Sequence, residues 1–283
     1  MSKILVSIDF SDCSINAFVH ALSIAQHCSS DLLLVWVEKP PSEKDKFEKQ
    51  AGEPARDVKK QFEEMIGKYQ PELPGNKITY KLRTGTIYKE IAKEAKDSKA
   101  MMVVAGTYGA SGFDEFWIGS NANKIVSAAP CPVITIRAGI NIMRPLKKIV
   151  LPIDRTLETR QKATFTGFLA KKHDAEVHIL SLYTSKVKAI RRDVNIYAGQ
   201  VELHYQQEGV NYQMAFKECD NISDAMIEYA LKTEANLISI MTEQESKTSN
   251  LWMGTYAHQT VNHSPIPVLS IHSKETYAAG SAF

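Results

Sequence analysis

The chain has 283 residues, enough for two domains of ordinary size. Charged residues make up 23% and hydrophobic residues 44%, and the formal net charge of +2 gives no strong attraction to nucleic acid or to a membrane surface. No apolar run approaches the roughly 20 residues that span a bilayer. A strand is predicted within three residues of the start, so we expect no signal peptide and a cytoplasmic location.

Strands and helices alternate along the first half. Apolar segments predict strands at Ile4–Ile8, Leu32–Val37, Lys77–Arg83, Met101–Ala105 and Val133–Arg137. Several of these are apolar throughout, as strands buried on both faces are. Helices are predicted at Ser14–Cys28, within Glu43–Tyr69 with a break near Gly52 and Pro54, at Ile87–Asp97 and at Asn121–Ala129. This alternation is typical of an α/β fold with a parallel sheet.

A glycine-rich loop lies between the strand Met101–Ala105 and the helix Asn121–Ala129. Its spacing is Gly-x2-Gly-x9-Gly-Ser, at Gly106, Gly109, Gly119 and Ser120. No Gly-Lys-Ser/Thr follows, so it is not a Walker A loop, and it is not the Gly-x-Gly-x-x-Gly of dinucleotide-binding folds. Glycines allow close backbone approach, and the start of a helix offers unpaired N–H groups to phosphate. The loop is therefore a candidate phosphate site.

Three motifs recur in the second half. Lys3–Asp9 recurs as Lys148–Asp154, Trp117–Ser120 as Trp252–Thr255, and Pro130–Ile136 as Pro265–Ile271. Repeats of this kind indicate two homologous domains, which we expect at residues 1–140 and 146–273, joined by a short linker near Gly139–Pro145. Strands of the second half are predicted at Lys148–Ile153, Glu176–Leu182, Asn211–Lys217, Asn236–Met241 and Val268–His272.

These motifs resemble those of the universal stress protein family. The loop matches all four positions of the family's ATP-binding signature, Lys3–Ser11 resembles its first strand with the terminal Asp, and Pro130–Ile136 its last strand. The resemblance implies two tandem five-stranded parallel-sheet domains with helices on both faces. Their fold would be adenine nucleotide alpha-hydrolase-like, with strand order 3-2-1-4-5. Right-handed crossovers fit that arrangement.

The strand order reverses between strands 1 and 4, and ligands of open α/β sheets bind at such points. Asp9 and Gly106 end those two strands. The resemblance implies that Asp9 contacts the nucleoside, although Asp also suits a turn or a helix N-cap. Ser7 and Ile8 would line the nucleoside pocket. Val37 would lie against the adenine, unless it is only a core residue.

The remaining candidate residues follow strand 4. Gly106 and Gly109, after Ala105, would let the backbone approach ribose and phosphates, and Gly119, Ser120 and Asn121 would hold the terminal phosphates. Ser120 also suits an N-cap. Because the loop has no His, Lys or Arg to clamp phosphate, a Mg²⁺ ion that bridges the phosphates would supply positive charge.

The second half departs from this pattern. Met241 and Gln244 stand where the first half has Gly106 and Gly109, with Glu243 and Glu245 close by. Bulk and negative charge there oppose phosphate, although Asp154, Gly254 and Thr255 are kept. We expect this half to bind ATP weakly or not at all, and to act as a structural partner or bind another ligand.

The favoured function is that of an ATP-binding regulatory protein of the stress response. The fifth strands of the two halves would pair antiparallel into an intramolecular pseudo-dimer, which could form a homodimer in turn. One alternative is a slow ATP hydrolase, but no general base or arginine finger is evident, so we expect slow turnover or none. Another is an assembly scaffold without a ligand. The cysteines and histidines have no metal-binding spacing, and buried, reduced thiols are expected.

Overall fold

The computed structural model describes residues 2–38, 53–107, 120–137, 145–242 and 255–273. The strands of the first half are β1 (Lys3–Ser7), β2 (Asp31–Glu38), β3 (Ile78–Thr84), β4 (Met102–Gly106) and β5 (Val133–Ile136). Those of the second half are β6 (Lys148–Ile153), β7 (Glu176–Tyr183), β8 (Tyr212–Glu218), β9 (Leu237–Thr242) and β10 (Val268–His272). All predicted strands of both halves are present, within one or two residues of the expected bounds.

The helices of the first half are α1 (Asp12–Cys28), α2 (Glu53–Tyr69), α3 (Ile87–Asp97) and α4 (Ser120–Ala128). Those of the second half are α5 (Lys162–His173), α6 (Lys188–Glu208), α7 (Ile222–Lys232) and α8 (Thr255–His263). Helix α1 begins two residues earlier than expected, because the Ser11 side chain accepts a hydrogen bond from the Ser14 N–H and caps the helix there. Among the described residues, no helix has the length and apolar character needed to cross a membrane.

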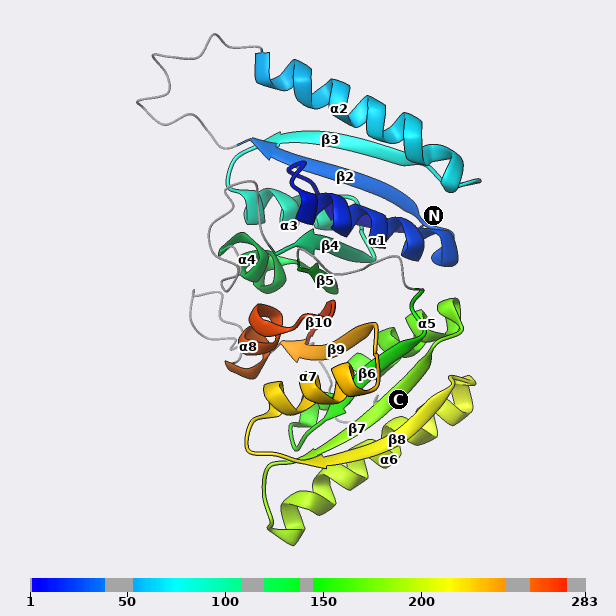
Figure 1. Cartoon of the computed structure of the whole chain (residues 1–283), viewed down its shortest axis with the longest axis vertical. Helices are drawn as coiled ribbons and strands as arrows, with labels where there is room; N and C mark the ends of the chain where they lie inside the picture. The colour runs from blue at the N-terminus through cyan, green and yellow to red at the C-terminus, as the bar shows by residue number, and fades with distance from the viewer. Residues whose placement is uncertain (1, 39–52, 108–119, 138–144, 243–254, 274–283) are drawn as a thin grey trace.

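The strands form one ten-stranded sheet in the order β3-β2-β1-β4-β5-β10-β9-β6-β7-β8 (Figure 1). Each half therefore has the predicted order 3-2-1-4-5. The fifth strands of the two halves, β5 and β10, meet at the centre of the sheet, so the second half runs through this order in the opposite direction. Within each half neighbouring strands are parallel. In both halves the order reverses beside the first strand, at β1–β4 and at β6–β9.

Side chains alternate between the two faces of the sheet and define two cores. On β1, Ile4 and Val6 pack with α1 and α2, whereas Leu5 packs with α3 and α4. Helices α5 and α6 continue the first of these layers and α7 and α8 the second. A sheet covered on both faces explains why its central strands are apolar throughout.

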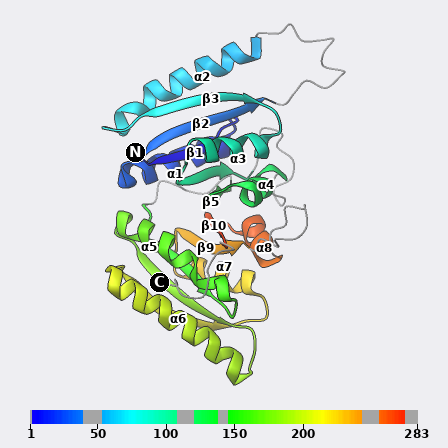
Figure 2. The same ribbon diagram turned by 180° about the vertical axis from the view of Figure 1, so that it is seen from behind.

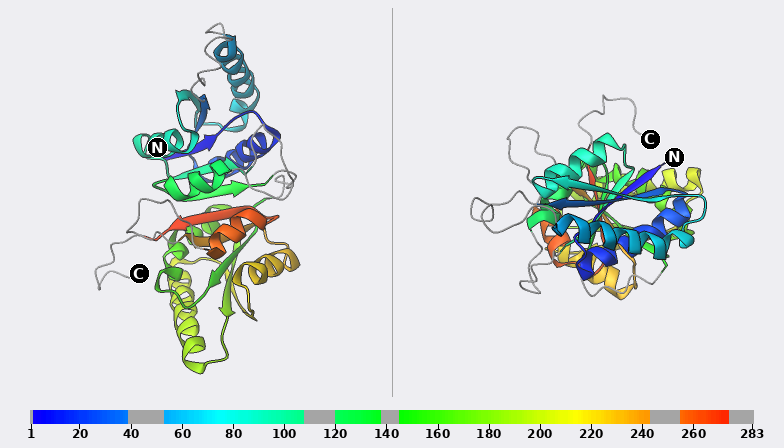
Figure 3. Two further views of the ribbon diagram at one scale, coloured as in Figure 1. Left: turned by 90° about the vertical axis from the view of Figure 1, so that its left-hand side faces the viewer. Right: turned by 90° about the horizontal axis from the view of Figure 1, so that it is seen from above.

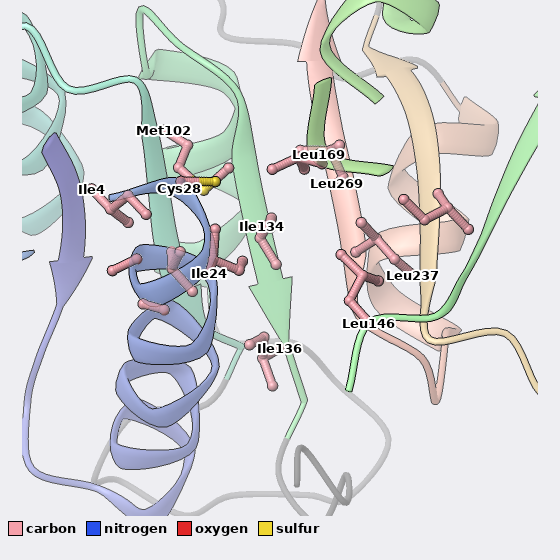
Figure 4. Packing of buried hydrophobic residues seen from close by; sticks show 14 of the residues in the cluster. Ile4, Ile24, Cys28, Met102, Ile134, Ile136, Leu146, Leu169, Leu237 and Leu269 are labelled. Carbon is pink, nitrogen blue, oxygen red and sulfur yellow. The ribbon is translucent and has the colours of Figure 1, made fainter. Parts of the chain in front are cut away.

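The two halves join at β5 and β10, which are antiparallel, with Leu269 opposite Ile134 and Val268 opposite Thr135. Figure 3 shows these two strands side by side at the middle of the molecule. The predicted pairing of the fifth strands is confirmed. One hydrophobic cluster crosses the junction, from Ile134 on β5 to Leu269 on β10 (Figure 4). The chain is therefore a pseudo-dimer with a continuous sheet and a shared core.

Helices from the two halves also meet on either face of the junction. On one face, the imidazole rings of His27 on α1 and His173 on α5 stack, with centroids 4.2 Å apart. On the other face, Asn123 of α4 donates to Asn262 of α8 over 3.0 Å and lies 3.4 Å from Nε2 of His258. No pattern in the sequence predicted the stacking of His27 on His173.

The expectation that the cysteines are buried, reduced thiols holds only in part. Cys13 and Cys28 are buried, but Cys131 and Cys219 are half-buried, and all four are free thiols. Cys131 lies in the turn before β5 and Cys219 directly follows the edge strand β8, where less protein covers a side chain. Of the predicted linker, only Pro145 is among the described residues.

Candidate functional site

The turn after β1 organises the candidate site of the first half. Asp9 is exposed, and its Oδ1 accepts hydrogen bonds from the Ser11 N–H at 3.1 Å and the Ser11 hydroxyl at 2.5 Å. The Asp9 N–H donates to the hydroxyl of Ser14, 3.3 Å away. Asp9 thus positions the residue that caps α1, which is close to the turn role that the sequence left open. Its exposed carboxylate lies at the carboxyl edge of the sheet.

Phe10 gives this turn an unusual backbone. Its φ is 62°, a left-handed conformation that is uncommon for a residue other than glycine. Its ring packs against Phe62 of α2, with centroids 4.8 Å apart, and Phe62 stacks on Tyr80 of β3 at 4.7 Å. Non-glycine residues in this conformation cost free energy and persist where surrounding packing holds them. The aromatic contacts therefore fix the turn that presents Asp9, and they join it to α2.

Gly106 ends β4 next to this turn. A Cβ placed there would come within 2.9 Å of both the carbonyl carbon and Sγ of Cys13, in the first turn of α1. Cys13 Sγ in turn lies 3.1 Å from the carbonyl oxygen of Ile136, its hydrogen-bond acceptor. The glycine is thus required by the close packing of α1 on the ends of β4 and β5. It brings the Asp9 turn and the end of β4 together, as the predicted strand order requires.

Thr107, which the sequence reasoning missed, follows Gly106. It is buried, its N–H donates to the Ile136 carbonyl over 2.9 Å, and its hydroxyl has no hydrogen-bond partner within the described structure. A buried polar group without a partner is costly and usually has a functional or solvent-related reason. Its place directly after the predicted glycine is the one signal that could have identified it.

The other predicted residues fall into two groups. Ser7 is half-buried and pairs with Ala105 across β1 and β4. The side chains of Ile8 and Ala105 are buried in the core. Val37 is half-buried and packs against the core. Ser120 and Asn121 begin α4, while Gly109 and Gly119 lie outside the described residues.

The second half repeats the three hydrogen bonds made by the aspartate of this turn. Asp154 Oδ1 accepts from the Thr156 N–H at 2.8 Å and from its hydroxyl at 2.6 Å. The Asp154 N–H donates to the Thr159 hydroxyl, 3.3 Å away. The repeat found in the sequence therefore extends to individual hydrogen bonds. The environment differs, because Asp154 is only 7% exposed whereas Asp9 is exposed.

A side chain fills the place of Gly106 in the second half. Met241 pairs with Ile271 as Gly106 pairs with Ile136, and it is buried. The residues that correspond to the first turn of α1 form a 3-10 helix, Leu157–Arg160, and α5 starts only at Lys162. In the first half the same helix begins directly over the glycine. Met241, where the sequence of the second half lacks the glycine of the first, therefore lies beside a helix, α5, that starts differently from α1.

Lys162 was also missed. It is 1% exposed and takes the place of Ala17 in the repeat, and its ammonium donates to the carbonyl and hydroxyl oxygens of Thr159 at 2.8 and 3.1 Å. Burial lowers the pKa of Lys162 to about 8, although the Asp154 carboxylate opposes this shift. The second half thus carries its own buried cation beside the aspartate turn.

Comparison with known proteins agrees with this geometry. The sequence model of the Universal stress protein family matches residues 1–137 and again 145–272. The chain belongs to the universal stress protein family. It carries two copies of the family's domain in tandem, each with a carboxylate turn at the end of its first strand.

Individual relatives share different parts of the chain. A universal stress protein, MJ0531, of Methanocaldococcus jannaschii is 28% identical over 147 residues, 48% of this chain and 81% of that protein. The crystal structure of a universal stress protein from Archaeoglobus fulgidus matches 96% of this chain and 98% of its own, at a TM-score of 0.72 and 15% identity. A universal stress protein solved in complex with cAMP matches 48% of this chain and 96% of its own, with a TM-score of 0.37 and 19% identity.

Proposed function

We propose that this universal stress protein binds ATP in its first domain and acts as a nucleotide-dependent regulator in a stress response. The observation that carries the proposal is the meeting of the Asp9 turn with Gly106 and Thr107 at the point where the strand order reverses. An exposed carboxylate can accept from a ribose hydroxyl or an adenine amine. The N-terminus of α4, in the position that the family signature gives to phosphate binding, supplies a favourable end for anions.

The residues present fit a nucleotide at this place. Thr107 offers a buried hydroxyl without a hydrogen-bond partner among the described residues, and Asp9 offers an exposed carboxylate on the same edge of the sheet. Within the described ranges, no group of three or more His, Cys, Asp or Glu side chains is arranged to hold a metal ion. In the proposal, a Mg²⁺ ion would bind together with the ATP phosphates and would neutralise part of their charge.

We propose that the corresponding site of the second domain does not bind ATP. Met241 places a side chain where the first domain has none, and the Asp154 carboxylate is buried and held by Thr156. Lys162 already supplies a buried cation next to that carboxylate. The proposed stoichiometry is one ATP per chain. A regulatory role rather than rapid hydrolysis is proposed, since residues 106–120 contain no His, Lys or Arg that could act on the phosphates.

The first test is isothermal titration of the protein with ATP and Mg²⁺, with Asp9→Asn as the variant. The amide keeps the size of the side chain but removes its charge, so the hydrogen bonds that it accepts from a ligand weaken. Losing a charged hydrogen bond costs about 1.5–3 kcal/mol, which corresponds to roughly a 10- to 100-fold rise in Kd. The wild type should bind close to one ATP per chain.

Asp154→Asn is the matched control, because Asp154 makes the same turn in the second domain. It should leave the ATP affinity and stoichiometry unchanged. Binding of two ATP per chain would contradict the assignment of the second domain. Absence of binding at millimolar ATP would overturn the proposal for the first domain as well.

A further inference from the structure

A polar side chain is buried in the second half where the first half has a leucine. His178 of β7 is 3% exposed. Strand β7 pairs with β6 in the register in which β2 pairs with β1, so His178 corresponds to Leu33, which is buried in the first half. Burial of a polar group costs free energy unless the group is hydrogen-bonded. Because the repeat accepts leucine at this position, packing alone does not explain the histidine.

His178 lies between the sheet and α7. Helix α7 covers one face of the second half of the sheet (Figure 1), and α5 and α6 cover the other (Figure 2). Two polar neighbours of His178 are Glu176, the first residue of β7, and Tyr229, near the end of α7. We call these three residues the Glu–His–Tyr array. It lies toward the amino ends of the strands, whereas the aspartate turns lie at the carboxyl ends, so it is separate from the proposed nucleotide site.

Two hydrogen bonds join the three side chains of the array. Nε2 of His178 lies 2.7 Å from Oε1 of Glu176, and Nδ1 lies 2.8 Å from the Tyr229 hydroxyl. An ionised carboxylate only accepts hydrogen bonds, so Nε2 carries the proton of the neutral imidazole. Nδ1 is then an acceptor, and the Tyr229 hydroxyl donates to it. A hydroxyl, an imidazole that accepts from it and a carboxylate that orients the imidazole are the parts of a base-activated nucleophile.

The first half has a different arrangement at the corresponding positions. Leu33 has no hydrogen-bonding group in its side chain. Glu94 is the eighth residue of α3, as Tyr229 is the eighth of α7, and its carboxylate pairs with Lys81 and Arg83 of β3. The Glu–His–Tyr array is therefore specific to the second half and is not a requirement of the shared fold.

The outer members of the array are partly open to solvent. Tyr229 is half-buried and the Glu176 side chain is 35% exposed, whereas the imidazole between them is covered. Burial and the nearby Glu176 carboxylate raise the pKa of Tyr229, so its phenol is protonated at pH 7 and needs a base to become a good nucleophile. Nδ1 of His178 is the base in contact with that proton.

We propose that Tyr229 is an acylation site, at which His178 and Glu176 activate the phenol toward a neutral activated ester or thioester. The phenolic oxygen attacks the carbonyl carbon of the donor, and its proton passes to Nδ1 of His178. The bond from that carbon to the leaving oxygen or sulfur breaks, and the leaving group departs with the bonding electrons. The product is an ester of Tyr229, and the Glu176 carboxylate stabilises the imidazolium until its proton is lost to solvent.

The charge of Glu176 favours acyl donors over phosphoryl donors. Only the imidazole separates this carboxylate from the phenol, and like charge opposes the approach of an anionic phosphate compound. The carbonyl group of an ester or thioester is neutral, so it does not meet this repulsion. An activated acyl compound is therefore the class of donor that the array fits.

Acetylation of the full chain by p-nitrophenyl acetate at pH 7 tests the proposal. Peptide mass spectrometry measures the rate at which each tyrosine gains an acetyl group. Tyr183 is the internal control, because it is also half-buried but donates its hydroxyl proton to the neutral amide oxygen of Asn195. General-base assistance contributes roughly 100-fold or more, so Tyr229 should react at least about 10-fold faster than Tyr183.

Two variants assign the effect to the array. His178→Leu introduces the residue of the first half and should slow acetylation of Tyr229 by about 100-fold, without changing that of Tyr183. Glu176→Gln, at a partly exposed position, removes the charge that stabilises the imidazolium and should slow the reaction by roughly 10-fold or more. Circular dichroism checks the fold of each variant, and Glu176→Gln decides if His178→Leu is misfolded. A Tyr229 that reacts no faster than Tyr183, or that keeps its rate in either folded variant, would overturn the proposal.

Discussion

At the scale of single residues, the two aspartate turns have the same bonds and different surroundings. Asp9 and Asp154 each accept from the N–H and hydroxyl of the residue two positions on. Short side chains with oxygen acceptors stabilise such turns whether or not a ligand binds. Exposure separates the two, because Asp9 lies at the surface and Asp154 is covered. An aspartate at the end of a strand is therefore insufficient evidence for a ligand site unless the exposure of its side chain is also known.

Gly106 supports a prediction at this scale. Gly106→Ala should lower the free energy of unfolding by about 1–3 kcal/mol, because the new Cβ would overlap the backbone of Cys13 rather than a flexible side-chain end. Urea denaturation measures the change. Gly67→Ala is the control, since a Cβ at Gly67 meets no atom within 4 Å and alanine favours the helix by about 0.5–1 kcal/mol. Equal effects of the two substitutions would contradict the packing role of Gly106.

At the scale of elements, a buried ionic cluster joins α3 to β3. The Glu94 side chain is fully buried and accepts hydrogen bonds from Lys81 at 2.7 Å and from Arg83. Burial by itself would raise the pKa of Glu94, but the Lys81 and Arg83 donors outweigh it and hold this pKa below its ordinary value. The carboxylate therefore stabilises the fold above about pH 4.5, and this contribution is lost as the pH falls through the lowered pKa.

Glu94→Gln tests this cluster. The amide keeps the shape of the side chain but removes its charge, so the free energy of unfolding at pH 7 should fall by about 1–3 kcal/mol. Glu64→Gln makes the same change in an exposed pair with Lys60, 3.8 Å apart on α2, and should cost less than about 0.5 kcal/mol. A Glu94 effect no larger than the Glu64 effect would mean that the cluster contributes little.

The elements were the part of the fold most accessible from the sequence. Continuous apolar runs such as Met101–Ala105 predicted the strands, the repeated motifs predicted two domains, and the resemblance to the universal stress protein family implied the strand order in each. Lys162 was not foreseen, because a lysine at a helix start is ordinarily solvated. Thr107 was not foreseen either, since the lack of a hydrogen-bond partner is a property of the folded environment. Contacts between the halves, such as His27 with His173, depend on how the domains pair and leave no local pattern.

At the scale of the whole molecule, histidines gather where α1 meets α5. His20 and His173 are buried, their Nε2 atoms have no hydrogen-bond partner among the residues described, and His173 stacks on His27. Burial lowers the pKa of each of these two buried histidines to about 4, and His27, His20 and Lys147 lower that of His173 further. The stability of the folded chain where α1 meets α5 therefore depends on these imidazoles staying neutral.

This arrangement predicts a loss of stability in acid. The unfolded chain binds protons at these histidines near pH 6.5, whereas the folded chain does so only near pH 4. The free energy of unfolding should thus be fully retained above pH 6.5 and fall between pH 6.5 and 4, by about 1.4 kcal/mol per pH unit for each histidine. Urea unfolding at pH 7, 6 and 5 measures the slope. His173→Gln should reduce it, and His263→Gln, at an exposed position, should not.

The contact of Asn123 with His258 has a consequence for how the molecule can change. The two residues occupy equivalent positions in the repeat, 135 apart, and they face each other across the junction. In an assembly of two identical chains, a residue on the symmetry axis can face only itself, so a substitution alters both sides at once. A covalent tandem removes that restriction, and each side of the contact can evolve separately. The halves can then become specific for each other, and one can lose a ligand while the other keeps it.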